Sequence, residues 1–512
     1  MSLSSETDIA PETLAEIGAR VGALYDPALF EAVGAELVSM VRAHLEQTAR
    51  SPVPALPWRE PAELLALARR RVAEAPATLP APDAGPRARL LDVAGDMLAH
   101  GNRLSSPHYL GHQVPAPVPL AGAFEVLCAT TNNPSGLYEM GPFPAAAERA
   151  LVEELGGHIG WPTGHDGVVT HGGSLANLTA LLTARAARYP DCWADGPVQG
   201  ERRPAILVGA DAHYSISRAA GIAGMGTRQV LRLPLDERRR VRPESIEPVL
   251  EKARADGLDP FCLVGSACST PIGAFDPLEP MGEIAARHGL WFHVDGAHGA
   301  SLLLSRRYRG LLHGIERADS VTWDAHKMMF VPALCTFLLL RDGRRAYETF
   351  NQDAPYLYDL DAHPTRDFDA LLRTVECTRR PMVMPVFALW AAFGPSLFED
   401  LVDLAIGRAR ELHALLSAAD DFEPLHTPEC NIVCFRHVPA RLRGRPVAEI
   451  SSLQADLRRR LTTSGEFYVT ITKIDGASCL RVVVMNPRVE RRHLEELLDA
   501  IRRLGQDRAR KL

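Results

Sequence analysis

The 512-residue sequence predicts an α/β fold with a mainly parallel central sheet, an N-terminal helical segment and a smaller C-terminal α+β domain. Three patterns predict it. In residues 11–105 the apolar side chains recur with the spacing of helices. From about residue 165, short β-branched runs alternate with helical stretches. After Pro385, a long amphipathic helical stretch precedes shorter strand-like runs. The expected domains are a helical segment (1–105), a large α/β domain (106–385) and a small α+β domain (386–512).

The N-terminal segment contains two stretches with helical periodicity, LAEIGARVGALYD and PAELLALARRRVAEA, with the proline-rich link SPVPALPW between them. The first residues, MSLSSETDIAPETLAEIG, carry early acids and no apolar core flanked by positive charge. No stretch is long and uncharged enough to cross a bilayer. We therefore expect a cytoplasmic protein with neither a secretory signal nor a membrane anchor.

The middle of the chain alternates strand-like and helical patterns. The strand-like runs are GVVT, AILVGAD, CLVGSA, LWFHVD, DSVTWD and TFLLLR, and helical patterns begin at Ser174, near residue 214 and at LEPMGEIAARHG. This alternation predicts parallel strands joined by crossover helices. Ligands of such a sheet bind at the C-terminal ends of its strands.

After Pro385, the amphipathic stretch PSLFEDLVDLAIGRARELHALLSA begins with a proline suited to a first helical turn. The shorter strand-like runs NIVCFRH and LRVVVMNP follow, and the helical stretch VERRHLEELLDAIRRLG comes after them. Together these patterns predict the small α+β domain.

The overall composition excludes some classes of function. The chain is 46% apolar, enough for a large core, and its 56 basic and 63 acidic residues, a net charge of -7, are spread along it without a basic stripe. We expect small molecules or further copies of the chain as partners, and neither nucleic acid nor a membrane. Nine cysteines without a CxxC pair, of which Cys430 and Cys434 are nearest, predict reduced and mostly buried thiols. We expect no metal site.

Lys327 lies in TWDAHKMMFVPALC, after the predicted strand DSVTWD and before a second apolar run. At the end of that strand it would reach the ligand crevice, where desolvation would lower the pKa of its amine and let it form an imine with an aldehyde. The alternative interpretation is a lysine whose stem packs on apolar neighbours while its ammonium group reaches solvent.

Asp295 ends another predicted strand, LWFHVD, 32 residues before Lys327. A carboxylate there can pair with the pyridinium nitrogen of pyridoxal phosphate, which keeps that ring an electron sink. Ala297 is small enough to let such a ring lie flat against the strand end. A carboxylate at a strand end is also a common loop or capping residue, so both interpretations stay open.

The segment GVVTHGGSLANLTALLTAR is typical of a strand, a glycine turn and a helix, with Gly172, Gly173 and Ser174 at the junction. Glycines let backbone N–H groups approach an anion, and Ser174 can both cap the helix and bond a phosphate at its N-terminus. Many helices begin this way without a ligand. The position of this turn, one crossover unit before the other candidates, favours a phosphate site.

Three further polar residues follow predicted strands. His213, in GADAHYSISRAAG, can stack its flat ring on a pyridine face. Ser269 and Thr270, in SACSTPIGAFDP, offer hydroxyl groups to ring substituents or to a phosphate. A histidine that caps the next helix and an ordinary polar turn are equally good interpretations of these residues.

Taken in order, THGGSLANLTAL, DAHYSISRA, STPIGAFDP, HVDGAHG and ADSVTWDAHK resemble the group II pyridoxal-phosphate-dependent decarboxylases. These fold-type I (aminotransferase-like) enzymes include glutamate, aromatic amino acid and diaminobutyrate decarboxylases. The similarity runs from about residue 100 to the C-terminus, and HYLGHQVPAPVPLAG and NNPSGLYEMGP look most like the diaminobutyrate branch. The resemblance implies pyridoxal 5'-phosphate as cofactor and an amino acid as substrate.

The resemblance also assigns roles by position. Lys327 would be the Schiff-base lysine, Asp295 the partner of the pyridinium nitrogen and His213 the stacking histidine, and these three form the catalytic set. Ala297 would line the other ring face, and Ser174 would hold the phosphate. The implied cofactor-binding set is Gly173, Ser174, His213, Thr270, Asp295, Ala297, His326 and Lys327.

The sequence departs from the family pattern beside the lysine. Ala325 stands where asparagine or proline is usual, and Met328 stands where an aromatic residue is frequent. Met328 can fill the space of an aromatic ring but does not stack in the same way.

A further departure concerns the proton donor. Many relatives carry a loop tyrosine that protonates the α-carbon after CO2 leaves, because a phenol supplies a proton and a phenyl ring does not. Between residues 359 and 381 this chain has no tyrosine: Phe368 and His363 lie there, and Tyr356 and Tyr358 precede them. In some relatives a phenylalanine there accompanies oxygen-dependent aldehyde formation. Amine and aldehyde products both stay open, with His363 as an alternative acid.

We predict a cytoplasmic amino acid decarboxylase that forms an amine and CO2 through a Lys327 Schiff base and a quinonoid intermediate. The alternatives are oxidative decarboxylation–deamination to an aldehyde, other carbon–carbon bond chemistry and a non-catalytic dimeric scaffold. The family implies a homodimer with active sites at the interface, part of residues 105–140 serving the neighbouring site. The diaminobutyrate branch favours a small or cationic amino acid, and Arg481 either meets a carboxylate or pairs with a neighbouring acid.

Overall fold

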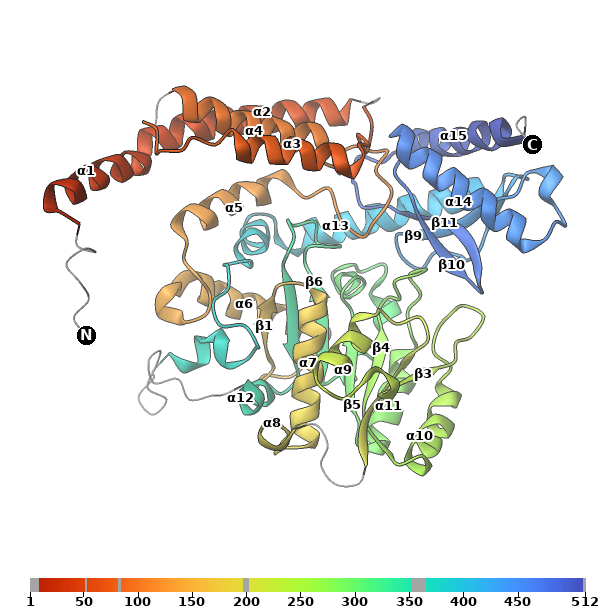
Figure 1. Cartoon of the computed structure of the whole chain (residues 1–512). Coiled ribbons are helices and arrows are strands. Elements are labelled where there is room, and N and C mark those ends of the chain that lie inside the picture. Colours follow the sequence, from red (N-terminus) through yellow and green to blue (C-terminus); the bar gives the residue numbers. More distant parts are fainter. Residues whose placement is uncertain (1–8, 51–52, 82–83, 197–201, 351–364, 510–512) are drawn as a thin grey trace. The chain divides into compact units, whose positions relative to one another are not determined.

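The computed structural model describes residues 9–50, 53–81, 84–196, 202–350 and 365–509. The chain divides into two compact units (Figure 1). The first comprises Met1–Tyr109 and Leu457–Tyr468, and the second comprises Leu110–Asp456 and Val469–Leu512. A division into three domains at residues 105 and 385 stays a prediction.

The first unit is helical, as predicted. Its N-terminal part contains α1 (Pro11–Gly22), α2 (Pro27–Ala49), α3 (Pro61–Ala73) and α4 (Ala84–His100). Proline opens the first three, where its missing N–H costs no hydrogen bond. The carboxylate of Asp26 caps α2 by accepting a hydrogen bond from the backbone N–H of Ala28 at 2.9 Å. Across the described ranges of the chain, every helix is too short or too polar to cross a membrane.

The second unit is built on a seven-stranded sheet in the order β1-β7-β6-β5-β4-β2-β3. Its strands are β1 (Asp166–Thr170), β2 (Arg203–Gly209), β3 (Val230–Leu233), β4 (Leu258–Ser266), β5 (Trp291–Asp295), β6 (Ser320–Asp324) and β7 (Thr336–Leu340). The mainly parallel sheet is confirmed. The parallel direction expected for β7 is wrong: β7 runs antiparallel to β1 and β6, because a connection without a helix returns the chain directly from β6.

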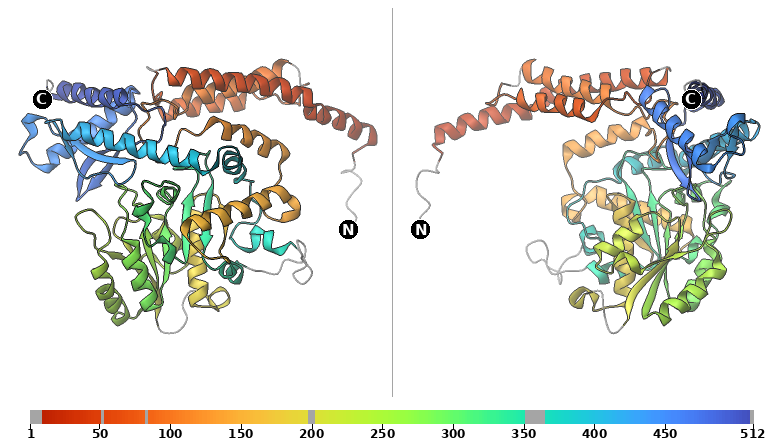
Figure 2. Two further views of the ribbon diagram at one scale, coloured as in Figure 1. Left: turned by 180° about the vertical axis from the view of Figure 1, so that it is seen from behind. Right: turned by 45° about the vertical axis from the view of Figure 1, so that its right-hand side comes forward.

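Helices cover both faces of this sheet (Figure 1, Figure 2). The helices that pack on its strands are α6 (Pro142–Ile159), α7 (Gly173–Arg188), α9 (Ser215–Ile222), α10 (Ile246–Ala255) and α11 (Leu278–His288). α5 (Pro119–Thr131) packs on α13 (Met384–Ser417), and both α8 (Cys192–Asp195) and α12 (Arg344–Phe350) pack on α7. Successive strand residues point to opposite faces. In β2, Ile206 and Val208 therefore join the core under α7 and α9, whereas Leu207 joins the core under α10 and α11. Burial on both faces explains the continuous apolar runs of the sequence.

The C-terminal part of the second unit is α+β, as predicted. Its elements are α13 (Met384–Ser417), β8 (Phe422–Pro424), β9 (Ile432–His437), α14 (Val447–Ser464), β10 (Thr470–Ile474), β11 (Ala477–Val483) and α15 (Arg491–Ala509). The strands form an antiparallel sheet in the order β10-β11-β9-β8, and α14 contributes residues to both units. α13 is interrupted at Gly394, whose φ of 67° is left-handed, and Pro395 then opens the helical run predicted from the sequence.

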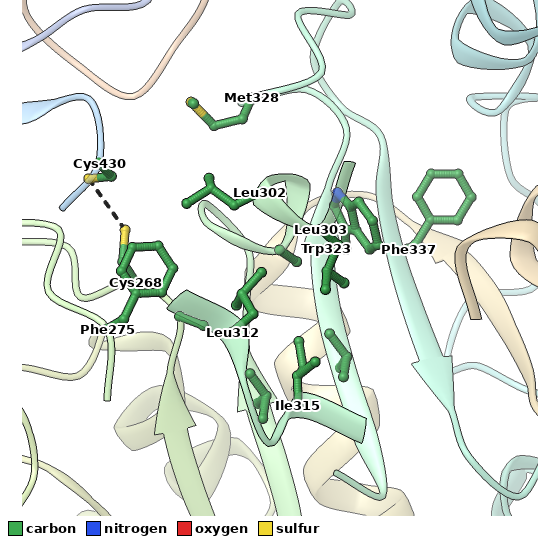
Figure 3. Packing of buried hydrophobic residues seen from close by; sticks show 14 of the residues in the cluster. Cys268, Phe275, Leu302, Leu303, Leu312, Ile315, Trp323, Met328, Phe337 and Cys430 are labelled. Carbon is green, nitrogen blue, oxygen red and sulfur yellow. Dashed lines mark hydrogen bonds between the residues drawn. The ribbon is translucent and has the colours of Figure 1, made fainter. Parts of the chain in front are cut away.

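Buried apolar side chains fix the end of β6 (Figure 3). Trp323 is fully buried in one cluster with Leu302 and Phe337, and its indole N–H donates to Oγ of Ser301 at 2.9 Å. Because Trp323 is held on all sides, the backbone of the next residue, Asp324, has a defined position.

Two buried arginines hold the segment 365–381 against the sheet. Nη2 of Arg379 lies 3.0 Å from Oε1 of Glu148, and Nη1 of Arg373 lies 2.9 Å from Oδ1 of Asp166. Both pairs are shielded from water. A charge that loses its partner in such a place costs several kcal/mol, so the pairs tie the segment to β1 and α6.

Replacing Arg379 by methionine leaves the Glu148 carboxylate buried without its cation. We expect the free energy of unfolding to fall by about 3–5 kcal/mol, measured by urea denaturation. Arg306→Met is the control, because Arg306 pairs with Glu399 while 87% of its own side chain is exposed, and it should change stability little. Equal midpoints for both variants would contradict the anchoring role of Arg379.

Candidate active site

A cavity of about 420 Å³ opens where β4, β5 and β6 end, and the last residues of these strands, Ser266, Asp295 and Asp324, line it. Parallel strands bring their C-terminal ends to one edge of a sheet, so residues far apart in the sequence meet there. The whole cofactor-binding set predicted from the sequence lines this cavity: Gly173, Ser174, His213, Thr270, Asp295, Ala297, His326 and Lys327.

Lys327 follows β6, and its Nζ lies 2.7 Å from Oδ2 of the buried Asp324. Burial lowers the pKa of Lys327, but attraction to Asp324 and Asp295 outweighs it, so the pKa is raised from its usual value. The same pairing holds the pKa of Asp324 below its usual value, although burial opposes this. The lowered lysine pKa expected from the sequence is therefore wrong, because burial acts together with a carboxylate three residues away.

Asp295 is oriented by Asn177 of α7. Nδ2 of Asn177 donates to Oδ2 of Asp295 and to Oγ of Ser215, both at 2.9 Å. Oδ1 of Asn177 accepts a hydrogen bond from Oγ1 of Thr322 at 2.7 Å, which fixes the orientation of the amide. The other carboxylate oxygen of Asp295 accepts from the backbone N–H of Ala297 at 3.3 Å. Within the described residues no cation forms an ion pair with Asp295, so its carboxylate can accept a proton-bearing nitrogen of a ligand.

The glycine turn before α7 matches an anion site. Gly172 has φ 99°, a left-handed conformation that favours glycine, and α7 begins at Gly173. A Cβ on Gly173 would lie 3.1 Å from Oδ1 of Asp324, so a side chain there would crowd the carboxylate. The predicted capping role of Ser174 is wrong, because Gly172 occupies the N-cap position and Ser174 lies inside the first turn. Ser174 is exposed and remains available to a phosphate at the helix N-terminus.

His213 presents a neutral ring to the cavity. Burial lowers the pKa of His213, and the nearby Asp295 only partly opposes this. Its Nδ1 accepts a hydrogen bond from the backbone N–H of Ser215 at 3.3 Å and lies 2.8 Å from Oγ of Ser215. The Ser215 hydroxyl already accepts from Asn177, so it donates to Nδ1, and the proton of the His213 ring is on Nε2. His213 therefore contacts the first turn of α9 and also lines the cavity.

The remaining predicted residues have distinct partners. Nδ1 of His326 lies 2.9 Å from the carbonyl oxygen of Cys335. The hydroxyl of Ser269 accepts from the backbone N–H of Ala274 at 3.2 Å, which makes it part of a turn, as the alternative interpretation held. Thr270 accepts, through its carbonyl oxygen, a hydrogen bond from Arg481 at 2.8 Å.

Of the loop residues discussed in connection with protonation, the structure describes Phe368. The ring of Phe368 packs against Tyr138, with ring centroids 5.3 Å apart, and Phe368 is not among the residues that line the cavity in the described chain. Tyr356, Tyr358 and His363 lie outside the described residues. The identity of the proton donor stays a prediction.

The sequence did not point to His171. This residue lines the cavity, and its Nδ1 is hydrogen-bonded to Oε1 of Glu376. Its only signal in the sequence is its place directly before the glycine turn.

The chemical groups of the cavity match the parts of pyridoxal phosphate. The amine of Lys327 suits an aldehyde, the carboxylate of Asp295 suits a protonated ring nitrogen, and the turn before α7 suits a phosphate. The cavity volume is within the range of sites for small molecules. The residues present therefore fit this cofactor.

Replacing Asp324 by asparagine removes the carboxylate that holds the proton of Lys327. We expect the pKa of Lys327 to fall, because burial then acts without its main opponent. NMR of ¹³C-methylated lysines in the cofactor-free protein measures this pKa. The spectrum is simple, because the lysines of the chain are Lys252, Lys327, Lys473 and Lys511.

Lys252 is the internal control, because its Nζ forms a surface ion pair with Asp256 at 2.7 Å that the substitution does not touch. Its pKa should be the same in both proteins. An unchanged pKa of Lys327 in the Asp324→Asn protein would show that Asp324 does not control the amine.

Comparisons with known proteins identify the family of the chain. The family model described as "Pyridoxal-dependent decarboxylase conserved domain" matches residues 98–438. The chain is 33% identical over 428 residues to the cysteine sulfinic acid decarboxylase of Rattus norvegicus, covering 82% of this chain and 86% of the relative. It is 31% identical over 426 residues to the acidic amino acid decarboxylase GADL1 of Mus musculus, covering 82% of this chain and 77% of the relative.

Solved structures show the same fold. The crystal structure of mouse CSAD has a TM-score of 0.87 at 31% identity and covers 94% of this chain and 100% of that chain. A second structure comes from Vibrio parahaemolyticus and is the glutamate decarboxylase domain of a diaminobutyrate-pyruvate transaminase and L-2,4-diaminobutyrate decarboxylase. It has a TM-score of 0.79 at 24% identity and covers 93% of this chain and 96% of that chain. At this identity it shows the fold alone. The predicted fold-type I architecture is confirmed. The chain belongs to the pyridoxal-dependent decarboxylase family and is a pyridoxal-phosphate-dependent amino acid decarboxylase.

Proposed function

We propose that the chain removes the α-carboxylate of a small acidic amino acid, with cysteine sulfinate and aspartate as the first substrates to test. The named activities of the relatives, on cysteine sulfinic acid and on acidic amino acids, support an acidic substrate. The structural observation that carries the proposal is the buried guanidinium group of Arg481 behind the cavity wall.

Arg481 lies on β11 and is 6% exposed. Its Nη2 donates to Oε1 of Gln113 at 3.2 Å and to the carbonyl oxygen of Thr270 at 2.8 Å, and its Nε donates to the carbonyl oxygen of Pro271 at 3.1 Å. Burial lowers the pKa of Arg481, yet a guanidinium group keeps its proton in proteins.

All of these acceptors are neutral, and no carboxylate in the described part of the chain pairs with Arg481. The alternative in which Arg481 pairs with a neighbouring acid is therefore not what the described residues show. Gln113 and Thr270 line the cavity, so the positive charge lies directly behind its wall. A buried cation without a counter-ion attracts an anionic ligand strongly, and this supports an acidic substrate.

The two sequence motifs that resemble the diaminobutyrate branch favour a small or cationic amino acid instead. A cationic side chain would meet the charge of Arg481 in a cavity of low dielectric constant, where like charges repel strongly. We therefore propose the acidic substrate over the cationic one.

The residues of the cavity support the roles that the family resemblance assigns. When bound, pyridoxal phosphate supplies an aldehyde carbon that reacts with amines and a ring that withdraws electrons from the α-carbon of the substrate. Lys327 would hold the aldehyde carbon, Asp295 the ring nitrogen, and Ser174 with the N-terminus of α7 the phosphate. Asn177 keeps the carboxylate of Asp295 in place as a hydrogen-bond acceptor.

Two proton positions follow from the hydrogen bonds. Asp324 holds a proton on Nζ of Lys327 whenever that amine is not covalently engaged, so Lys327 is a proton carrier inside the cavity. His213 stays neutral and can pack its flat ring on a ligand without adding charge. Asp295 would keep the ring nitrogen of the bound cofactor protonated, so that the ring could withdraw electrons from the α-carbon of the substrate.

A substrate screen tests the proposal. The purified holoenzyme is assayed for CO2 release from cysteine sulfinate, aspartate, glutamate and 2,4-diaminobutyrate, with the organic product identified in each case. We expect the highest kcat/KM with cysteine sulfinate or aspartate, because Arg481 favours a second anionic group. Preference for 2,4-diaminobutyrate would defeat the proposal.

Replacing Arg481 by methionine removes the cation. We expect kcat/KM for the acidic substrate to fall about 10–100-fold, because a hydrogen bond to a charged group contributes about 1.5–3 kcal/mol. Arg436→Met on the neighbouring strand β9 is the matched control, because the guanidinium of Arg436 pairs with Glu423 at 3.4 Å. A loss of equal size in both variants would mean that the effect comes from the sheet and not from substrate binding.

We propose that the product is an amine and not an aldehyde. Phe368 packs beside Tyr138 and is not among the described residues that line the cavity. A phenylalanine in the cavity, which accompanies aldehyde formation in some relatives, is therefore not what the described residues show. We expect one amine for each CO2, and neither ammonia nor hydrogen peroxide, when the reaction runs in air. Ammonia in amounts equal to CO2 would show oxidative deamination instead.

We also propose a homodimer in the cytoplasm. α5 exposes apolar side chains that a second copy would cover: Leu120, Phe124, Val126 and Leu127. α5 lies within residues 105–140, the region that the family resemblance assigns to the neighbouring site. All nine cysteines are free thiols and eight are buried, which supports a reducing compartment.

A further inference from the structure

Two cysteines and a histidine from separate segments meet in the wall of the cavity. The sulfur atoms of Cys268 and Cys430 lie 3.7 Å apart (Figure 3). These two sulfurs and one ring nitrogen of His298 all lie within 4.8 Å of one another, and all three residues are buried. Cys268 and His298 line the cavity, and Cys430 lies behind them in the segment before β9.

Asn431 fixes the tautomer of the neutral His298 ring. Nδ2 of Asn431 donates to the carbonyl oxygen of Val484 at 2.8 Å and to Sδ of Met485 at 2.9 Å. Its Oδ1, 2.7 Å from Nε2 of His298, is therefore an acceptor. Nε2 of His298 carries the proton, and Nδ1 carries a lone pair.

The lone pair on Nδ1 of His298 accepts no hydrogen bond from the described residues. Nδ1 is buried and has no hydrogen-bond partner among the described residues. Burial lowers the pKa of His298 to about 3, so the ring is neutral. A buried acceptor without a partner costs free energy, and a ligand that binds it removes this cost.

The spacing of the sulfurs matches a tetrahedral thiolate site. Two sulfurs bound to one Zn²⁺ at about 2.3 Å in tetrahedral geometry lie about 3.8 Å apart, close to the spacing of Cys268 and Cys430. A histidine that ligates a metal through one nitrogen almost always donates its other N–H to a fixed acceptor. Asn431 is such an acceptor for His298.

Gly273 keeps the two cysteines close. Its φ of 77° is left-handed, and a Cβ at this position would lie 2.1 Å from Sγ of Cys430. Any other residue would therefore displace the sulfur. The turn that carries Cys268 packs on Cys430 because this position is glycine.

We propose that Cys268, Cys430 and His298 bind one thiophilic metal ion of the zinc class, with a fourth coordination position open to the cavity. Three protein ligands and one open position are typical of zinc sites that exchange a ligand. The two thiols lose their protons when the ion binds, so two thiolates balance its charge and two protons are released. An ion in this wall occupies substrate space and lowers the decarboxylase activity reversibly.

This site carries no motif in the sequence. Its ligands come from three segments, and neither cysteine has a second cysteine two or three residues away. A sequence pattern does not report on ligands that only the fold brings together, so the proposal differs from the sequence-based expectation of no metal site.

The test is a Zn²⁺ titration of the holoenzyme in a reductant without thiols, with metal content measured after dialysis and proton release measured in weak buffer. We expect one ion per chain and two protons per ion. Cys430→Ser should weaken binding about 100-fold or more, because loss of a ligand exceeds loss of a supporting hydrogen bond. Cys192→Ser is the matched control, because Cys192 is equally buried in a separate cluster.

Zinc that inhibits the parent and the Cys192→Ser protein, spares the Cys430→Ser protein and is reversed by a chelator supports the site. Equal binding by the parent and the Cys430→Ser protein overturns it, and so does a parent protein that binds no ion. A reduced protein that takes up no metal but forms a Cys268–Cys430 disulfide under an added oxidant overturns it in favour of a redox pair. These outcomes do not depend on which amino acid is the substrate.

Discussion

The ion pair between Lys327 and Asp324 is the interaction around which the cavity is organised. A buried ammonium group is costly without a partner, and the last residue of β6 supplies one. Asp324 is held in turn by Thr336, whose hydroxyl donates to its Oδ1 at 2.5 Å, and by the buried Trp323 before it. Gly173 leaves room for the carboxylate from the opposite side. The amine therefore has a fixed place relative to the sheet and to the start of α7, which any ligand that reacts with it and binds α7 requires.

The sheet register determines which groups share the cavity with this amine. β4, β5 and β6 are parallel neighbours, and their pairing sets Ser266 beside Asp295 and Asp295 beside Thr322. Asn177 reaches from α7 onto this row and links Asp295 and Thr322 to Ser215 of α9. One hydrogen-bond network therefore joins two strands and two helices under the ligand site. Such networks act as units, so a change in Asn177 affects the orientation of more than one member.

The sequence was informative wherever function follows a strand end. The places of Lys327 and Asp295 in the cavity were predictable, because parallel strands converge at their C-terminal ends and this needs only the strand pattern. The roles of the two residues stay a prediction. The direction of β7 was not predictable, because an apolar run does not report strand direction. Asn177 and Asp324 were missed, because their roles arise from contacts between a helix and the sheet. Asn177 could have been predicted as a site residue, because it follows Ser174 by three residues and so lies on the same face of the helix.

The electrostatics of the cavity support the proposed acidic substrate. Burial lowers the pKa values of His213 and His298, so both rings are neutral near pH 7 and add no positive charge. The charge of Lys327 is matched by Asp324. Arg481 is a buried cation next to this wall, and no carboxylate in the described chain pairs with it. A phosphate held at the N-terminus of α7 does not need Arg481, because helix N–H groups and the helix dipole bind it. The guanidinium group therefore stays available for the second anionic group of the proposed substrate, which links the electrostatics of the fold to the proposed choice of substrate.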